Sequence, residues 1–136
     1  METDVAKRKA VGLSATDCPL TAALDVIGGK WSLIILYWLY GGRKRFNELR
    51  RLMPAVSHKM LASTLRNLER EGLVTRTVYP EVPPRVDYSV SGYGRSVRPV
   101  VEAIRGWGRQ HLDQRRHRRA NSSLTSTLSS SCDANT

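Results

Sequence analysis

The chain has few acidic residues, with 12 Asp and Glu against 22 Lys and Arg among its 136 residues. The imbalance lies in the middle of the chain, where residues 18–112 hold 15 basic and 7 acidic side chains. A basic surface on a folded domain attracts polyanions. The composition therefore favours duplex nucleic acid or an anionic membrane as the partner.

Long apolar runs are also missing. The longest, from Trp31 to Tyr40, has ten residues including Ser32, whereas a membrane-spanning helix needs about 20. We therefore interpret this run as a buried helix and expect no membrane partner. The N-terminus begins acidic and has no apolar segment after its basic residues 7–9, so we expect no secretory signal and predict a cytoplasmic protein.

Cysteine is scarce, because only Cys18 and Cys132 are present, at opposite ends of the chain and without a CxxC pair. This pattern argues against a zinc ribbon and against a disulfide framework. The three histidines, His58, His111 and His117, do not share metal-ligand spacing with one another or with either cysteine. No Ser, His and Asp set falls in a strand-turn-helix context. We therefore expect no metal, no cofactor and no enzymatic activity.

Apolar residues make up 40% of the chain, which is enough for one domain with a core. We expect that domain to span residues 17–112. Residues 1–16 lack apolar periodicity and are predicted to form a flexible arm. Residues 113–136 are basic at first and then rich in Ser and Thr. Their small apolar area cannot offset the entropy of ordering, so we predict a disordered tail.

Apolar spacing and the positions of Gly and Pro predict the elements of this domain. They are helices at about residues 19–27, 30–40, 46–53 and 57–71, strands at 73–78 and 85–90, and a last helix at 93–112. Three prolines between the strands mark a hairpin tip. The fold class that follows is mainly α with a small antiparallel β hairpin.

The helices at 46–53 and 57–71 are amphipathic. The first is predicted to bury Phe46, Leu49, Leu52 and Met53. The second has Ser57 as a suitable N-cap and is predicted to bury Met60, Leu61, Thr64, Leu65 and Leu68. Its opposite face carries Lys59, Ala62, Ser63, Arg66 and Arg70. The exposed face of this helix therefore carries small, polar and basic side chains.

Three helices, a tight turn, a fourth helix and a two-stranded hairpin form the order of a winged helix-turn-helix, in which the helix after the turn enters the major groove of DNA. The candidate DNA-binding residues on that helix are Ser57, His58, Lys59, Ala62, Ser63, Arg66 and Arg70. The cationic side chains can reach phosphates or guanine edges, and the small Ala62 permits close approach or touches a thymine methyl. The alternative is that the basic side chains are simply solvated on an exposed helix. The surrounding architecture favours the DNA-binding interpretation.

Basic residues outside this helix are further candidates. In the hairpin, or wing, Arg76 and Arg85 could contact the DNA backbone or enter the minor groove, or they could simply keep the hairpin soluble. The run Arg43, Lys44 and Arg45 precedes the third helix and is predicted to be a phosphate clamp. Such a clamp adds affinity without sequence specificity.

Six blocks of sequence occur in order: Cys18–Trp31, Arg45–Leu49, Ser57–Leu61, Leu65–Glu69, Gly72–Arg76 and Tyr79–Tyr88. Together they resemble the HxlR-type branch of the MarR-like transcription regulators, over the region from Cys18 to about Gly108. The resemblance implies a homodimeric winged-helix regulator, most often a repressor, that binds a palindromic operator in double-stranded DNA through this motif. His58 stands where the family commonly has Pro, and Ala62 where it often has Thr, so the operator sequence is not carried over.

The last predicted helix carries residues at spacings of 3, 4, 3 and 4, which is typical of helix pairing. They are Val97, Val100, Ile104, Trp107 and His111. The resemblance implies a dimer interface made by the terminal helices, so we expect these residues and Leu20 to form it. Glycines 94, 106 and 108 weaken the helix, at about 1 kcal/mol each relative to Ala. Dimer packing is expected to supply much of its stability.

Cys18 lies at the start of the first predicted helix. Unpaired N–H groups and the positive end of the helix dipole lower the pKa of a thiol placed there, although Asp17 opposes this. The alternative is that Cys18 is a small, half-buried apolar residue at the dimer interface. The resemblance favours a sensor, because the cysteine at this position responds to oxidants or reactive electrophiles in many members. Cys132 is interpreted as an inert exposed thiol, or alternatively as a resolving partner for Cys18 of the other subunit.

Two other classes of function remain open. A small basic RNA-binding or ribosome-associated protein would fit the charge, but such proteins usually stack bases on exposed aromatics. Here Trp31, Trp38 and Trp107 fall on apolar helix faces and are predicted to lie in the core. A protein-interaction module could use the same fold without DNA. The basic face of helix 57–71 argues against that second alternative.

Overall fold

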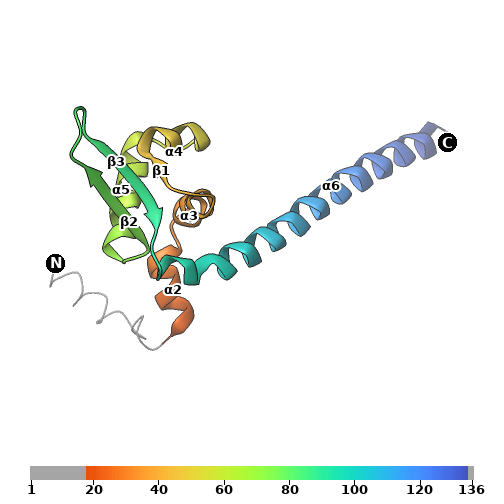
Figure 1. Ribbon diagram of the computed structural model, residues 1–136. Coiled ribbons are helices and arrows are strands. Elements are labelled where there is room, and N and C mark those ends of the chain that lie inside the picture. The colour runs from red at the N-terminus through yellow and green to blue at the C-terminus, as the bar shows by residue number, and fades with distance from the viewer. Residues whose placement is uncertain (1–17, 135–136) are drawn as a thin grey trace. The chain divides into compact units, whose positions relative to one another are not determined.

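The computed structural model describes residues 18–134, and the surroundings of side chains as far as residue 124 (Figure 1). The predicted arm at residues 1–16 lies outside the described residues. The chain forms two compact units that divide after Arg98. The first unit contains every helix and strand up to that residue, and the second consists of one long helix.

From residue 18 on, where its structure is described, the first unit holds four α-helices, a short 3₁₀ helix and a three-stranded sheet (Figure 1). The helices are α2 (Pro19–Ile27), α3 (Ser32–Tyr40), α4 (Phe46–Leu52), α5 (His58–Arg70) and η1 (Gly94–Val97), and the strands are β1 (Lys44–Arg45), β2 (Val74–Tyr79) and β3 (Arg85–Val90). Both strand pairs are antiparallel, in the order β1-β3-β2. The predicted fold class is therefore confirmed. Of the strands, β1 was not predicted, because a strand of two residues shows no periodicity, and the predicted helix from residue 93 is divided into η1 and α6.

The core forms around α3, which is apolar on nearly all sides and contacts α4, α5 and β3. Its Ile35, Leu36 and Leu39 are buried together with leucines from α5. Burying each such side chain contributes about 1.5–3 kcal/mol to folding. In the described part of the chain, no single helix is long and apolar enough to cross a membrane, and α2 with α3 meets that standard only as a pair bent by 75°.

On α4 and α5, two side chains predicted to be buried are exposed instead. Met60 is 49% exposed and Leu52 is 37% exposed. On α5 the buried stripe follows Leu61, Leu65 and Leu68, and Met60 lies about 100° around the helix from Leu61. The stripe is thus narrower than the sequence predicts. Leu52 is the last residue of α4, beyond the buried Leu49.

The C-terminal helix is longer than predicted. Helix α6 runs from Arg98 to Ala134, so the predicted end near Leu112 and the predicted disordered tail at 113–136 were wrong wherever the backbone is described. A helix satisfies its backbone hydrogen bonds internally and needs no core to do so. No Gly or Pro follows Gly108 in the sequence to stop it. Asp113 and Arg116 also form an ion pair of 3.8 Å on its surface.

Gly94 is required by packing and does not weaken a helix. It lies in η1, ahead of α6, and its carbonyl oxygen accepts a 2.7 Å hydrogen bond from the Tyr40 hydroxyl. A Cβ atom here would overlap the Leu73 carbonyl oxygen and come within 2.8 Å of a Val90 methyl. The expectation that Gly94 destabilises the last helix was therefore wrong.

We predict that Gly94→Ala lowers the free energy of unfolding by about 1–3 kcal/mol, because the added methyl collides with backbone. Gly92→Ala is the matched control, since a Cβ at that position meets nothing within 4 Å. Urea denaturation of both variants measures the difference. Equal stability of the two would contradict the packing argument.

Candidate nucleic-acid interface

Helix α5 is fixed at both ends and along one face. The Ser57 hydroxyl accepts a 3.0 Å hydrogen bond from the Met60 N–H, so Ser57 caps the N-terminus of the helix. The residue after the C-cap is Gly72, whose φ of 80° suits glycine. Because the leucines hold the inner face, the outer face is presented to solvent. It exposes His58, Lys59, Ser63, Arg66 and Arg70, with Ala62 half-buried among them.

The start of α5 lies beside the start of α4. The rings of Phe46 and His58 are 4.7 Å apart between centroids. Arg45 precedes Phe46, and its backbone N–H donates a 3.1 Å hydrogen bond to the Glu48 carboxylate in a capping box. His58 is thus a packing residue as well as a DNA-binding candidate.

Arg76 of β2 lies on the α5 side of the sheet. It lines a hollow of about 310 Å³ together with Ala62, Arg66, Glu69 and Tyr88. The structure therefore brings one of the predicted wing arginines together with two residues of the exposed α5 face. Arg66 and Arg76 give this hollow two positive charges against one from Glu69.

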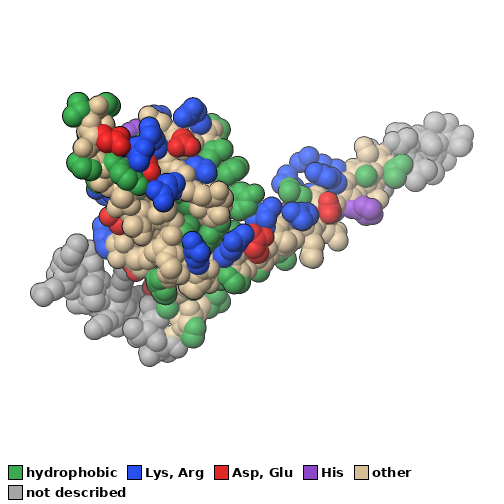
Figure 2. Space-filling model, viewed as in Figure 1, with side chains coloured by type: hydrophobic (Ala, Val, Ile, Leu, Met, Phe, Trp, Pro, Cys, Tyr) green, Lys and Arg blue, Asp and Glu red, His purple; other side chains and the backbone are tan. Residues whose placement is uncertain are grey.

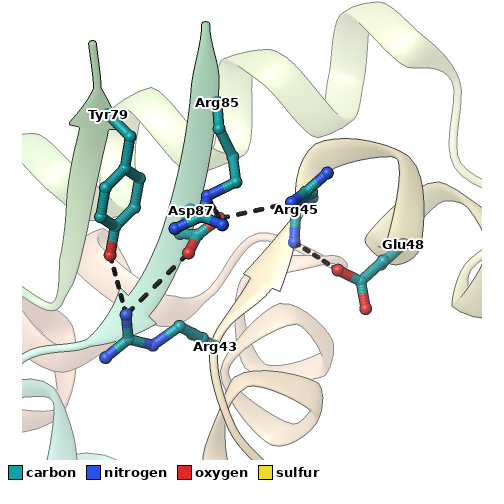
Figure 3. A network of polar contacts seen from close by, with 6 residues as sticks. All are labelled: Arg43, Arg45, Glu48, Tyr79, Arg85 and Asp87. Carbon is teal, nitrogen blue, oxygen red and sulfur yellow. Dashed lines mark hydrogen bonds and ion pairs between the residues drawn. The ribbon is translucent and has the colours of Figure 1, made fainter. Parts of the chain in front are cut away.

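The other predicted arginines converge on a buried carboxylate (Figure 3). The distances from Asp87 to Arg43, Arg45 and Arg85 are 4.0, 3.9 and 3.7 Å, and the Asp87 side chain is only 10% exposed. Tyr79 contacts two of these arginines: its hydroxyl accepts a 2.8 Å hydrogen bond from Arg43, and its ring lies 4.0 Å from the Arg85 guanidinium. We call Arg43, Arg45, Tyr79, Arg85 and Asp87 the arginine cluster.

The arginine cluster and the Arg76 hollow lie on opposite faces of the sheet. Arg76 is paired with Tyr88 across the strands, whereas Thr77 and Arg45 are paired with Asp87. Side chains of neighbouring residues in a strand point to opposite faces. Lys44, paired with Tyr88, therefore points away from the arginines on either side of it. The structure thus separates Lys44 from Arg43 and Arg45, and the phosphate contacts of residues 43–45 stay a prediction.

Asp87 and Tyr79 were missed as site residues by sequence reasoning. An available signal was the alternation Arg85-Val86-Asp87, which places a carboxylate and a guanidinium on one face of a strand. Tyr79 gave no such signal in the sequence, because its contacts to Arg43 and Arg85 form only when the sheet is assembled. Figure 2 shows Lys and Arg side chains grouped on the face that carries β3 and α4, with Asp and Glu between them. Within the described residues, no three His, Cys, Asp or Glu side chains are placed to hold a metal ion.

Cys18 is the N-cap of α2 and is half-buried. Hydrogen bonding from the side chain and the backbone N–H of Thr21 lowers the pKa of the Cys18 thiol, against a smaller increase from burial, and the Leu20 N–H lowers it further. Leu20 and Leu24 of the same helix are 68% and 56% exposed. The thiol thus lies beside an apolar helix face that the described chain leaves uncovered.

Helix α6 also exposes apolar side chains. Val100, Ile104 and Trp107 are 41%, 50% and 65% exposed, and the Trp107 ring stacks on His111 at 5.2 Å. The prediction that Trp107 lies in the core was therefore wrong for the single chain. Val97 does not belong to this stripe, because it lies in η1 and packs against the core of the first unit.

Residues 26–116 match the HxlR-like helix-turn-helix family. The chain belongs to this family. A relative in Bacillus subtilis, the uncharacterized HTH-type transcriptional regulator YdeP, is 47% identical over 97 residues, which are 71% of this chain and 76% of YdeP. Members are named as transcriptional regulators, and this chain is one of them rather than an enzyme.

Solved structures of two regulators resemble the HxlR-like chain closely. The redox regulator HypR in its oxidised form is 47% identical with a TM-score of 0.66, covering 68% of this chain and 96% of HypR. The reduced form of the Bacillus subtilis transcriptional regulator YodB is 35% identical with a TM-score of 0.61, covering 68% of this chain and 92% of YodB. The family match begins at Val26, so Cys18 lies outside that match.

Proposed function

We propose that this HxlR-like regulator binds a palindromic operator in double-stranded DNA as a homodimer and represses transcription. The observation that carries the proposal is the exposed face of α5, on which Lys59, Ser63 and Arg66 point away from a helix held by its leucines. Helix α5 follows α4 and a tight turn, which is the arrangement that places a recognition helix in the major groove.

The expected contacts divide into two kinds. Ser63 and Ala62 are short enough to meet base edges, and Arg66 can reach a guanine or a phosphate. Arg76, on the same side of the sheet, adds a charge beside Arg66. Backbone contacts of this kind position the protein, whereas base contacts specify the sequence.

A second copy of the chain is the proposed partner of the uncovered apolar residues. Leu20 on α2 and Val100, Ile104 and Trp107 on α6 would be buried by a symmetric dimer. Exposed apolar side chains that gather on one face of a helix are typical of interaction sites in soluble proteins. A dimer would place two α5 helices in successive major grooves about 34 Å apart.

Cys18 is the proposed switch. Its position beside the uncovered face of α2 links the thiol to the dimer interface, and its lowered pKa favours the reactive thiolate. Similarity to a redox regulator supports the same role. Oxidation or alkylation of this thiol would alter the interface and release the operator.

The direct test is selection of bound sequences from a random duplex pool. We expect an inverted repeat to be enriched, and Arg66→Ala to weaken binding of the selected duplex and reduce the salt slope by about 1. Arg109→Ala, which removes the same charge from α6, is the matched control. Failure to enrich any duplex, or preferential binding of double-stranded RNA, would contradict the proposal.

Dimerisation is tested by sedimentation equilibrium. Truncation of Trp107 to Ala removes the largest exposed apolar side chain on α6, and we expect it to weaken the dimer by about 2 kcal/mol or more. Arg109→Ala again serves as the control, because Arg109 lies on the opposite face of the helix. A wild-type protein that stays monomeric at tens of micromolar would refute the dimer.

Reactivity of Cys18 is tested in a Cys132→Ser background, where one thiol remains. We expect alkylation to reach half its maximal rate at a pH below that of a free thiol, because the thiolate forms at lower pH when its pKa is lowered. Thr21→Val removes one hydrogen bond and should move this midpoint upward. Electrophile treatment should release operator DNA from the Cys132→Ser protein and leave a Cys18→Ser protein bound. Equal release from both would rule out the switch.

A further inference from the structure

The buried Asp87 carboxylate lies near three arginines and forms a close ion pair with none of them. Its three nitrogen-to-oxygen distances of 3.7–4.0 Å are longer than a direct hydrogen bond. No guanidinium therefore closes a bidentate pair with Asp87. One negative charge faces three positive charges, which leaves an excess of two.

The cluster also contains an unused donor. The Arg85 Nε atom is buried and has no hydrogen-bond partner among the described residues. Buried donors without an acceptor are costly, so natural proteins seldom leave them unless a ligand or a water satisfies them. The Nε atom is shielded from solvent, so an incoming anion would meet the exposed ends of Arg43 and Arg45, where the excess positive charge attracts it.

The arginine cluster borders α4, the helix that precedes the turn of the helix-turn-helix. Arg45 and Arg85 line a groove of about 810 Å³ between α4 and the wing turn. Its other charged lining residues are Arg51, Glu48 and Glu81, so positive charges outnumber negative ones by three to two. Arg45 is directly followed by Phe46, which touches His58 at the start of α5. A DNA strand lying at the start of α5 would therefore pass these guanidinium groups.

We propose that Asp87 is a positioning residue for DNA binding: it holds Arg43, Arg45 and Arg85 in a preset array that receives backbone phosphates at the base of the wing. This inference rests on the proposed function. Three long side chains would otherwise lose rotamer freedom on binding, which costs about 0.5–1.5 kcal/mol for each. The carboxylate, and Tyr79 beside it, impose that order before DNA arrives.

An electrostatic role and a positioning role of Asp87 predict opposite changes in DNA affinity when the carboxylate is removed. Asp87→Asn raises the net charge by one, and charge alone would strengthen binding to DNA. If Asp87 acts by positioning, the same change weakens binding in spite of the added charge. The sign of the effect therefore separates the two explanations.

The experiment measures binding of the full-length protein to the selected duplex by fluorescence anisotropy at several salt concentrations. We expect Asp87→Asn to weaken binding by about tenfold. Asp87→Glu keeps the charge and should recover most of the affinity. Glu71→Gln is the matched control, because it adds the same charge at an exposed residue without an ion pair in the described chain. We expect its affinity to be unchanged or slightly higher.

A double-mutant comparison excludes a merely structural effect. In a protein carrying Arg43→Ala, Arg45→Ala and Arg85→Ala, the further change Asp87→Asn should no longer weaken binding, because nothing is left to position. Thermal melting of each variant establishes that it is folded at the assay temperature. Unchanged or tighter binding by Asp87→Asn, or a loss that persists without the arginines, would overturn the inference while leaving the proposed function intact. A wild-type protein that binds no duplex would overturn the proposed function itself.

Discussion

Burial of α3 against α4, α5 and β3 is the interaction on which the rest of the first unit depends. Because Leu61, Leu65 and Leu68 of α5 are taken up by this core, the opposite face of α5 has to face solvent. The same core holds Leu73 at the start of the hairpin, next to the close approach of Gly94. The burial of these leucines thus fixes the orientation of α5.

Charge is distributed over this frame in two different ways. On the α5 side, Arg66 and Arg76 share a hollow with a single carboxylate from Glu69. On the other side of the sheet, three guanidinium groups surround the buried Asp87. In the proposed complex, the first group would meet base edges and the second backbone phosphates. Base contacts specify the sequence, whereas backbone contacts position the protein.

Sequence predicted most of the fold because the decisive signals are local. The run from Trp31 to Tyr40, apolar except for Ser32, the Ser57 cap and the prolines of the hairpin each determine one element without reference to the rest. Prediction from the sequence failed where a residue's role depends on contacts with distant parts of the chain. Asp87 becomes a site residue only when β1 pairs with β3, and Gly94 becomes indispensable only beside the Leu73 carbonyl. The length of α6 was missed because the polar composition after Leu112 was taken to exclude order, although no Gly or Pro follows Gly108 to stop the helix.

In the proposed function, the outward face of α5 contacts duplex DNA in a two-fold assembly. Hydroxyl-radical footprinting of the wild-type protein on its selected duplex tests these contacts directly. We expect two protected regions related by symmetry and separated by about one helical turn. One unbroken protected region, a single protected half-site at saturating protein, or no protection would contradict it.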